Sequence, residues 1–279
     1  MKNNKLNNVI LRRILAISAL ISLVLLLLCS CNVTGDAEQN RGRTVNSVNH
    51  RGYIDAPENT LAAFRMSKQM GFDFVECDVR FTKDGVAVLL HDRYVNRTSN
   101  GSGKLSDMTF EQARTLDFGS WKSKQYVGER IPTFEEFIDL CVELELHPYV
   151  EIKNGATLAQ AGQLFEAVKA ANISVTWIAR DIEYLSELHK LGSCDRLGLL
   201  LDVITDKAVQ SMLSIDRKLT FINANYSFLT RSGIDLCKRN SIPLEVWTID
   251  NTDTITHIDS YVSGITSNKY NAQQLFDNI

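Results

Sequence analysis

The chain has 279 residues, of which 44% are hydrophobic and 23% charged, a composition typical of a folded protein with one large domain or two small ones. The first 13 residues include four basic residues and no acidic ones, so the remainder carries 26 Lys and Arg against 33 Asp and Glu, a net charge near −7. This acidic balance argues against nucleic acid as the main partner, and an anionic small molecule would have to be attracted by local positive charge.

Residues 1–30 have the pattern of a secretory leader. A basic segment is followed by an almost wholly apolar run over 14–28, which is short for a transmembrane helix. The leader ends Leu-Cys-Ser-Cys, which resembles a bacterial lipoprotein signal, so Cys31 is expected to become a lipidated N-terminus. An ordinary signal anchor is the alternative. Residues 31–43 are polar and predict a flexible tether, so we expect an exported, membrane-anchored lipoprotein facing the periplasm or the cell exterior.

Strand-like and helix-like runs alternate from residue 44 to residue 279. The predicted strands cover 44–50, 72–78, 147–153, 174–179, 196–202, 219–223, 243–249 and 262–266. The predicted helices cover 58–70, 133–145, 157–171, 181–191, 206–214, 228–240 and 252–260. Such alternation predicts an α/β architecture with a parallel sheet, and eight strands within 236 residues predict a single-domain (β/α)8 barrel of the TIM type.

The apolar run 86–90 does not fit this alternation, because a parallel neighbour needs a crossover of about a dozen residues. We therefore interpret 78–91 as a β-hairpin with Asp84-Gly85 at the centre of its turn, a register that sets Asp78 opposite His91. The alternative is that 86–91 is itself a barrel strand. Residues 92–131 then form a long irregular segment, which in a barrel belongs over the C-terminal face, where active sites lie.

Three carboxylates lie at the ends of predicted strands. Glu76 and Asp78 are two residues apart and therefore project from the same face, while Cys77 points the other way. Glu151 occupies the equivalent place on the next barrel strand. Carboxylates that converge need a cation between them, and ligand sets made only of oxygen suit Mg²⁺ or Ca²⁺. We expect one such divalent ion at Glu76, Asp78 and Glu151; surface or salt-bridged acids are the alternative.

His50 and His91 are the two histidines that end apolar strand runs, and they are the candidates for general acid and base. Arg51 follows His50 and is expected to bind phosphate oxygens through two hydrogen bonds, while Lys153 can reach a phosphate as a point charge. His147 begins a strand, at the opposite end of the predicted barrel. Together these residues predict metal-assisted cleavage of a phosphate ester.

Two further residues are an aromatic near a predicted strand end, which has two interpretations, and an asparagine near the start of a predicted helix. Trp247 either packs the barrel or forms the wall of a substrate pocket. Asn59 is expected to hydrogen-bond at the start of a helix. The four cysteines beyond Cys31 could pair in an exported protein, but buried free thiols fit their apolar or helical surroundings better. They are Cys77, Cys141, Cys194 and Cys237.

In this order, these motifs resemble the glycerophosphodiester phosphodiesterase family over nearly all of 44–268. The matching segments are His50-Arg51-Gly52, Ala56-Pro57-Glu58-Asn59-Thr60, Glu76-x-Asp78-Val79, Thr82-x-Asp84-Gly85, His91-Asp92, Leu116-Asp117-x-Gly119-Ser120-Trp121, Glu129-Arg130-Ile131-Pro132-Thr133, Glu151-Ile152-Lys153 and Trp247-Thr248. The resemblance implies a TIM-type barrel that hydrolyses glycerophosphodiesters to an alcohol and glycerol 3-phosphate. It also implies a divalent metal at Glu76, Asp78 and Glu151, with His50 and His91 as acid and base.

The C-terminal half departs from the family pattern. The family often has Asn where this chain has Asp250, and Thr-Asp where it has Ser267-Asn268; a Ser-Phe pair is absent near Ile178-Ala179. These positions bear on substrate choice, so a lysophospholipase D-like or sugar phosphodiesterase is an alternative. A lipoprotein that binds glycerophosphodiesters without cleaving them is another alternative, although such a protein would not need two histidines as an acid–base pair. Attack by a substrate hydroxyl, giving a cyclic phosphate, and attack by water both stay open.

Overall fold

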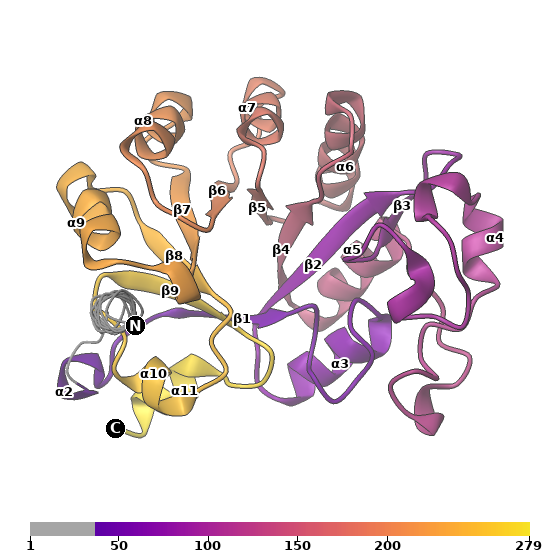
Figure 1. The fold of residues 1–279 in the computed structure, drawn as a ribbon, viewed down its shortest axis with the longest axis horizontal. Coiled ribbons are helices and arrows are strands. Elements are labelled where there is room, and N and C mark those ends of the chain that lie inside the picture. The colour runs from indigo at the N-terminus through magenta and orange to yellow at the C-terminus, as the bar shows by residue number, and fades with distance from the viewer. Residues whose placement is uncertain (1–36) are drawn as a thin grey trace, which may run out of the picture. The chain divides into compact units, whose positions relative to one another are not determined.

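The computed structural model describes residues 37–279 (Figure 1). The predicted leader 1–30 and the predicted lipid site Cys31 lie outside these described residues. Within the predicted tether, Ala37–Asn40 form the short helix α2. Asn40 is buried there, and its side-chain amide donates to the carbonyls of Thr256 at 2.7 Å and Ile258 at 3.1 Å. No helix among residues 37–279 is both long and apolar enough to span a membrane.

The strands form a closed barrel of eight parallel members, as predicted. Its order is β1-β9-β8-β7-β6-β5-β4-β2, and β1 pairs with β2 to close it. The barrel strands are β1 Asn46–His50, β2 Phe74–Phe81, β4 His147–Ile152, β5 Thr176–Ala179, β6 Arg196–Leu201, β7 Thr220–Asn225, β8 Leu244–Trp247 and β9 Val262–Ser267. All eight overlap the strands predicted from the sequence, because their runs of buried apolar residues are long and separated by amphipathic helices.

Helices follow most barrel strands, and α6, α7 and α8 lie on the outer side of the strands (Figure 1). The helices are α3 Leu61–Gln69, α4 Phe110–Arg114, α5 Phe134–Leu144, α6 Leu158–Ala171, α7 Ile182–Lys190, α8 Asp206–Ile215, α9 Arg231–Asn240, α10 Thr252–Thr256 and α11 Ala272–Asp277. Threonine N-caps fix where several of these helices begin, because the hydroxyl accepts a hydrogen bond from the first turn. The predicted helices 58–70 and 228–240 therefore begin later, after Thr60 and Thr230.

The run after β2 is the predicted hairpin and not a barrel strand. Strand β3, Ala87–Leu89, pairs antiparallel with the end of β2, but the predicted register is wrong by one residue. The turn has three residues, Lys83 to Gly85, with Gly85 at φ 81°, where a two-residue turn was expected. Leu90, not His91, therefore lies opposite Asp78, and its N–H donates to the Asp78 carbonyl at 2.9 Å.

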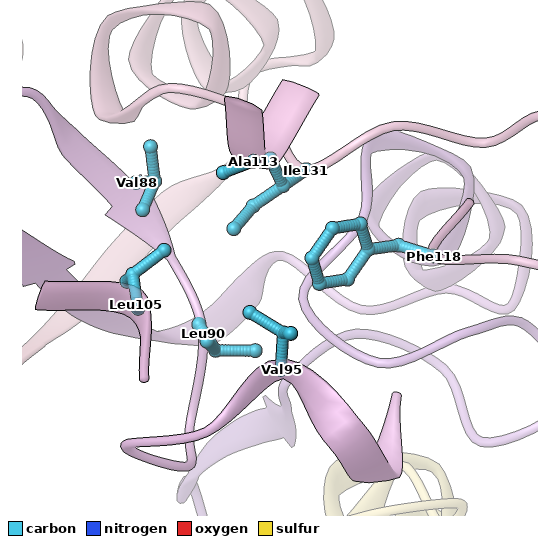
Figure 2. Close-up of a cluster of buried hydrophobic side chains, with 7 residues drawn as sticks. All are labelled: Val88, Leu90, Val95, Leu105, Ala113, Phe118 and Ile131. Atoms are coloured by element: carbon cyan, nitrogen blue, oxygen red, sulfur yellow. The ribbon is translucent and has the colours of Figure 1, made fainter. Parts of the chain in front are cut away.

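The long segment 92–131 contains three single-turn 3-10 helices, at Val95–Arg97, Leu105–Asp107 and Lys124–Tyr126, together with α4. It has a small apolar core of its own, shown in Figure 2. The residues of that core are Val88, Leu90, Val95, Leu105, Ala113, Phe118 and Ile131. Val88 belongs to β3 and Leu90 directly follows it. This core therefore attaches the loop to the hairpin and holds it beside the carboxyl ends of the strands.

The opposite end of the barrel interior is closed by a buried polar cluster. Glu245 is 2% exposed and accepts hydrogen bonds from Arg196 at 2.7 Å and Asn46 at 3.2 Å. Tyr149 also contacts this carboxylate, and the Arg196 guanidinium stacks over the Phe221 ring at 4.2 Å. Because these groups satisfy one another, they fill the barrel interior at this end, and active sites of such barrels lie at the opposite, carboxyl end.

The cysteines are free thiols, as expected, and no disulfide joins any two of them among the described residues. Cys77, Cys141 and Cys237 are buried. Cys194 is exposed, so the prediction that it is buried is wrong. It lies in the turn after α7 and not in an apolar element, which the sequence around it (Gly-Ser-Cys-Asp) could have indicated.

Candidate active site

The predicted site residues meet in one pocket at the carboxyl ends of the barrel strands. One side of this pocket is lined by His50, Arg51, Glu76, His91, Glu151 and Lys153. The other side is lined by Ile178, Arg180, Leu200, Asn223, Trp247 and Thr266. The barrel therefore joins residues that are more than two hundred positions apart in the chain, with charged groups on one wall and mainly apolar or neutral groups on the other.

The three carboxylates form a buried group at the centre of the charged wall. Glu76, Asp78 and Glu151 are 3%, 0% and 9% exposed, and each offers an oxygen within 4.8 Å of the others. The parallel register of β2 and β4 places Asp78 beside Glu151, and the strand repeat of two places Glu76 on the same face as Asp78. Burial and repulsion from Asp78 and Glu151 raise the pKa of Glu76 well above its ordinary value.

Two cationic side chains contact this carboxylate group. The Lys153 ammonium lies 2.8 Å from Glu151 and 3.1 Å from Asp78 Oδ1, and Arg51 Nε lies 3.1 Å from Asp78 Oδ2. Burial alone would raise the pKa of Asp78, but Lys153 and Arg51 outweigh it and hold that pKa far below its ordinary value. Burial and the negative charge of Asp78 raise the pKa of Glu151 to about 7.

The donor set fits a hard divalent cation. Asp78 Oδ1 is buried without a hydrogen-bond partner, since its contact with Lys153 lacks hydrogen-bond geometry. Three buried carboxylates this close repel one another, and the two cations Lys153 and Arg51 offset only part of their charge. A ligand set made only of oxygen, with Glu76, Asp78 and Glu151 converging, is the environment that Mg²⁺ and Ca²⁺ prefer.

The turn after β1 places Arg51 beside the carboxylates and requires glycine at position 52. Arg51 has φ 56° and Gly52 has φ 82°. A Cβ on Gly52 would lie 2.5 Å from the Cβ of Ala63, so only glycine lets this turn pack against α3. The turn directs the Arg51 N–H to Glu76 Oε2 at 2.9 Å, which orients one carboxylate through the backbone.

His50 is held through its Nδ1 atom by a chain of two polar residues. Asn268 Oδ1 lies 2.8 Å from His50 Nδ1, and the Asn268 amide nitrogen donates to Asp250. Because Asp250 can only accept, the Asn268 nitrogen must face it, and the Asn268 oxygen must face His50. His50 therefore carries its proton on Nδ1, which leaves Nε2 free to accept one. Burial and the positive charge of Arg51 lower the pKa of His50 to about 4.

His91 is held by a carboxylate instead. Its Nδ1 lies 2.7 Å from Asp92 Oδ1, and Arg97 connects Asp92 to Glu58 through hydrogen bonds of 2.7 and 2.6 Å. The Arg80 guanidinium donates to the His91 carbonyl at 2.9 and 2.7 Å. These contacts bring His91 into the pocket although the hairpin register differs from the prediction. Burial lowers the pKa of His91, against the opposing effect of nearby carboxylates.

Asn59 acts differently from the expectation drawn from its sequence. Thr60, not Asn59, caps α3, so the expected helix-start role is wrong. Asn59 has φ 56°, donates to Asp78 Oδ2 at 2.8 Å and accepts from the Asp78 N–H at 3.1 Å. This paired contact fixes the central carboxylate. The only sequence signal was its position within the Ala-Pro-Glu-Asn-Thr segment.

Trp247 lines the pocket and also packs against the barrel core, so both of its interpretations have a structural counterpart. Its indole N–H donates to the Asn223 carbonyl at 3.2 Å, and the Arg180 guanidinium lies 5.2 Å from its ring. Sequence reasoning missed Arg180 and Asn223. Arg180 directly follows β5 and Asn223 lies within β7, both in segments without a recognisable motif, and only the closed barrel places them opposite the carboxylates.

Comparison with known families matches residues 50–272 to the Glycerophosphoryl diester phosphodiesterase family. A curated glycerophosphodiester phosphodiesterase from Caldanaerobacter subterraneus subsp. tengcongensis is 31% identical over 224 residues, covering 78% of this chain and 91% of that protein. Glycerophosphodiester phosphodiesterase 1 from Bos taurus is 42% identical over 250 residues, covering 78% of this chain and 76% of that protein.

The fold also has solved counterparts. A phosphodiesterase from Oleispira antarctica, solved in complex with the product sn-glycerol-3-phosphate, matches with a TM-score of 0.78 and 23% identity, covering 88% of this chain and 100% of that chain. A glycerophosphodiester phosphodiesterase from Agrobacterium tumefaciens matches with a TM-score of 0.68 and 24% identity, covering 85% and 100%. At these identities the structural likeness establishes the shared TIM-type barrel.

Proposed function

Because the chain belongs to the glycerophosphoryl diester phosphodiesterase family, we propose that it hydrolyses glycerophosphodiesters to an alcohol and glycerol 3-phosphate with one divalent cation. It is a phosphoric diester hydrolase, and its substrate is a small molecule. The observation that carries the proposal is the convergence of three buried carboxylates, two histidines and two cationic side chains on one pocket.

In the proposed mechanism, the two histidines have different roles because their Nδ1 partners differ. Burial and the positive charge of Arg51 keep His50 uncharged, and Asn268 holds its proton on Nδ1, so His50 Nε2 accepts the proton of the attacking hydroxyl or water. The carboxylate of Asp92 stabilises an imidazolium at His91, so His91 donates a proton to the leaving alcohol. Arg51 and Lys153 lie where they can bind phosphate oxygens. Held by Glu76, Asp78 and Glu151, a Ca²⁺ or Mg²⁺ ion would add positive charge against the developing charge on phosphate.

The proposed function is tested by a substrate panel. Glycerophosphocholine, glycerophosphoethanolamine, glycerophosphoglycerol and glycerophosphoinositol are each expected to release glycerol 3-phosphate, whereas lysophospholipids are expected to be poor substrates. Release from lysophospholipids alone would show a lysophospholipase D-like enzyme, and tight binding of glycerophosphodiesters without turnover would show a binding protein. Incubation in ¹⁸O-labelled water, with a search for a transient cyclic phosphate, distinguishes attack by a substrate hydroxyl from attack by water.

Asp250 and Asn268 are expected to support catalysis together. The family often has Asn at the first position and Asp at the second, so this chain has the two residues exchanged while a hydrogen bond joins them. Asp250→Asn frees the Asn268 amide to turn, and Asn268→Asp sets two carboxylates against each other. Each single change should lower kcat by about 10- to 100-fold, the range for residues that orient a functional side chain.

The double exchange, Asp250→Asn with Asn268→Asp, should recover most of that activity, because a carboxylate at position 268 can accept both from an amide at position 250 and from His50 Nδ1–H. Nitrogen-15 NMR of His50 is the second readout: the Nδ1–H tautomer should persist in wild type and in the double variant and become mixed in Asp250→Asn. Losses that multiply in the double variant would contradict this arrangement.

We propose further that the protein is exported and held at a membrane by lipid on Cys31. The support is the order of basic, apolar and Leu-Cys-Ser-Cys segments in 1–31. Fatty-acid labelling and fractionation are expected to place the wild-type protein with membranes, and Cys31→Ala is expected to leave an unlabelled precursor. A soluble, cleaved and unlabelled wild-type protein would instead indicate an ordinary signal peptide.

A further inference from the structure

A second cleft lies next to the catalytic pocket along three chain segments. It has a volume of about 380 Å³ and is lined among others by Arg80, Arg93, Lys104, Ser106, Asn154 and Gln160. Arg80 continues β2 two residues beyond Asp78, and Asn154 directly follows Lys153. Arg93 lies two residues after His91. Each of these three segments therefore carries one residue of the active site and one residue of the cleft.

The cleft concentrates positive charge in an otherwise acidic protein. None of its lining residues is acidic, and within residues 37–279 no ion pair is made by Arg80, Arg93 or Lys104. Arg80 is fixed by its hydrogen bonds to the carbonyls of His91 and Asn154. Three cations that line one cleft, with no acidic residue in its lining, are an arrangement that an anionic ligand stabilises.

We propose that this cleft binds a second phosphate group, carried on the alcohol portion of the substrate. Two guanidinium groups and one ammonium can offset the negative charge of a phosphate, and the side chains of Ser106, Asn154 and Gln160 supply neutral donors around it. The inference rests on the proposed function, because it assumes that the scissile phosphate lies between Arg51 and Lys153. The favoured substrates are then glycerophosphodiesters whose alcohol is itself phosphorylated.

Two compounds test this selectivity: glycerophosphoglycerol, and the same compound with a phosphate on its terminal hydroxyl. The kcat/KM of the phosphorylated compound should be about tenfold higher at low ionic strength, since contacts with the exposed Arg93 and Lys104 are each modest, and the advantage should shrink in salt. Arg93→Gln with Lys104→Gln should remove the preference while leaving turnover of glycerophosphoglycerol unchanged. Lys218→Gln with Arg239→Gln removes the same charge from exposed positions remote from the cleft and should keep the preference.

Binding measurements separate this inference from the proposed function. Calorimetry with the His50→Ala variant should show tighter binding of the phosphorylated compound, again lost with Arg93→Gln and Lys104→Gln. If neither compound is hydrolysed but this binding difference is found, the proposed function fails and the phosphate site stands. Equal kcat/KM and equal binding of the two compounds would overturn the site.

A phosphate could also come from a lipid headgroup or from solution, and two further measurements distinguish these sources. Inorganic phosphate should compete with the phosphorylated compound and leave glycerophosphoglycerol turnover less affected. Vesicles of phosphatidylglycerol and phosphatidylcholine should not retain the chain from residue 37 onward through Arg93 and Lys104. Retention that those two substitutions abolish, together with no preference between the soluble compounds, would assign the cleft to lipid headgroups and overturn the substrate inference.

Discussion

Replacing His50 or His91 by alanine should lower kcat by about 10²–10⁴-fold, the usual range for loss of a general acid or base. Both imidazoles line the pocket beside the carboxylates, and each is oriented through Nδ1, by Asn268 at 2.8 Å and by Asp92 at 2.7 Å. Alanine removes the proton acceptor or donor but leaves Arg51 and Lys153. Substrate binding, measured by calorimetry on the inactive variants, should therefore change much less than kcat.

His147→Ala is the matched control for this measurement. His147 begins β4 at the opposite end of the barrel, where its Nε2 lies 2.9 Å from Thr176 Oγ1. Its loss should leave kcat nearly unchanged, although it removes an imidazole from the same strand that carries Glu151. If both catalytic histidines serve one proton-transfer cycle, the losses should not multiply in the double variant. Wild-type kcat in His91→Ala would refute the assignment of the leaving-group acid.

The sequence was sufficient for the barrel because its strands carry runs of apolar residues separated by amphipathic helices. It was also sufficient to bring Glu76, Asp78 and Glu151 together, because the strand repeat of two and the common carboxyl end of parallel strands determine which side chains converge. The predicted hairpin register was wrong by one residue. The sequence Lys-Asp-Gly permits both a two-residue and a three-residue turn, and the left-handed conformation at Gly85 selects the longer one.

The residues that sequence reasoning missed act through contacts between distant segments. Asn59 appeared to be a helix-start residue, yet it contacts Asp78 because Arg51, Gly52 and Asn59 all take left-handed backbone conformations that turn this segment over the strand end. The departures at Asp250 and Asn268 appeared to concern substrate choice. The structure shows that they contact each other and that Asn268 also contacts His50, a relation that no local pattern records.

Removing divalent cations should abolish turnover, and adding Ca²⁺ or Mg²⁺ back should restore it. Three buried carboxylates each place one oxygen within 4.8 Å of the others, and one Asp78 oxygen lacks a hydrogen bond. Glu76→Gln should reduce both activity and metal affinity, while Glu143→Gln, which changes an exposed acid paired with Arg65, should affect neither. The measurements are turnover after chelation, with metal content checked by mass spectrometry, and metal titration by calorimetry.

Thermal or chemical unfolding gives a readout of the same site that does not depend on turnover. In the metal-free protein the raised pKa values of Glu76 and Glu151 mean that the folded state holds protons more tightly than the unfolded chain. The free energy of unfolding should therefore fall as pH rises from the ordinary carboxylate range toward about 7, the pKa of Glu151.

A cation that binds the ionised carboxylates should reverse this loss, adding about 2.7 kcal/mol at a hundred times its dissociation constant. Because protons compete with the cation, the gain should be larger at pH 7 than at pH 5 and smaller in Glu76→Gln. Full turnover by verified metal-free enzyme, or a metal-induced gain that Glu76→Gln leaves intact, would remove the cation from this site.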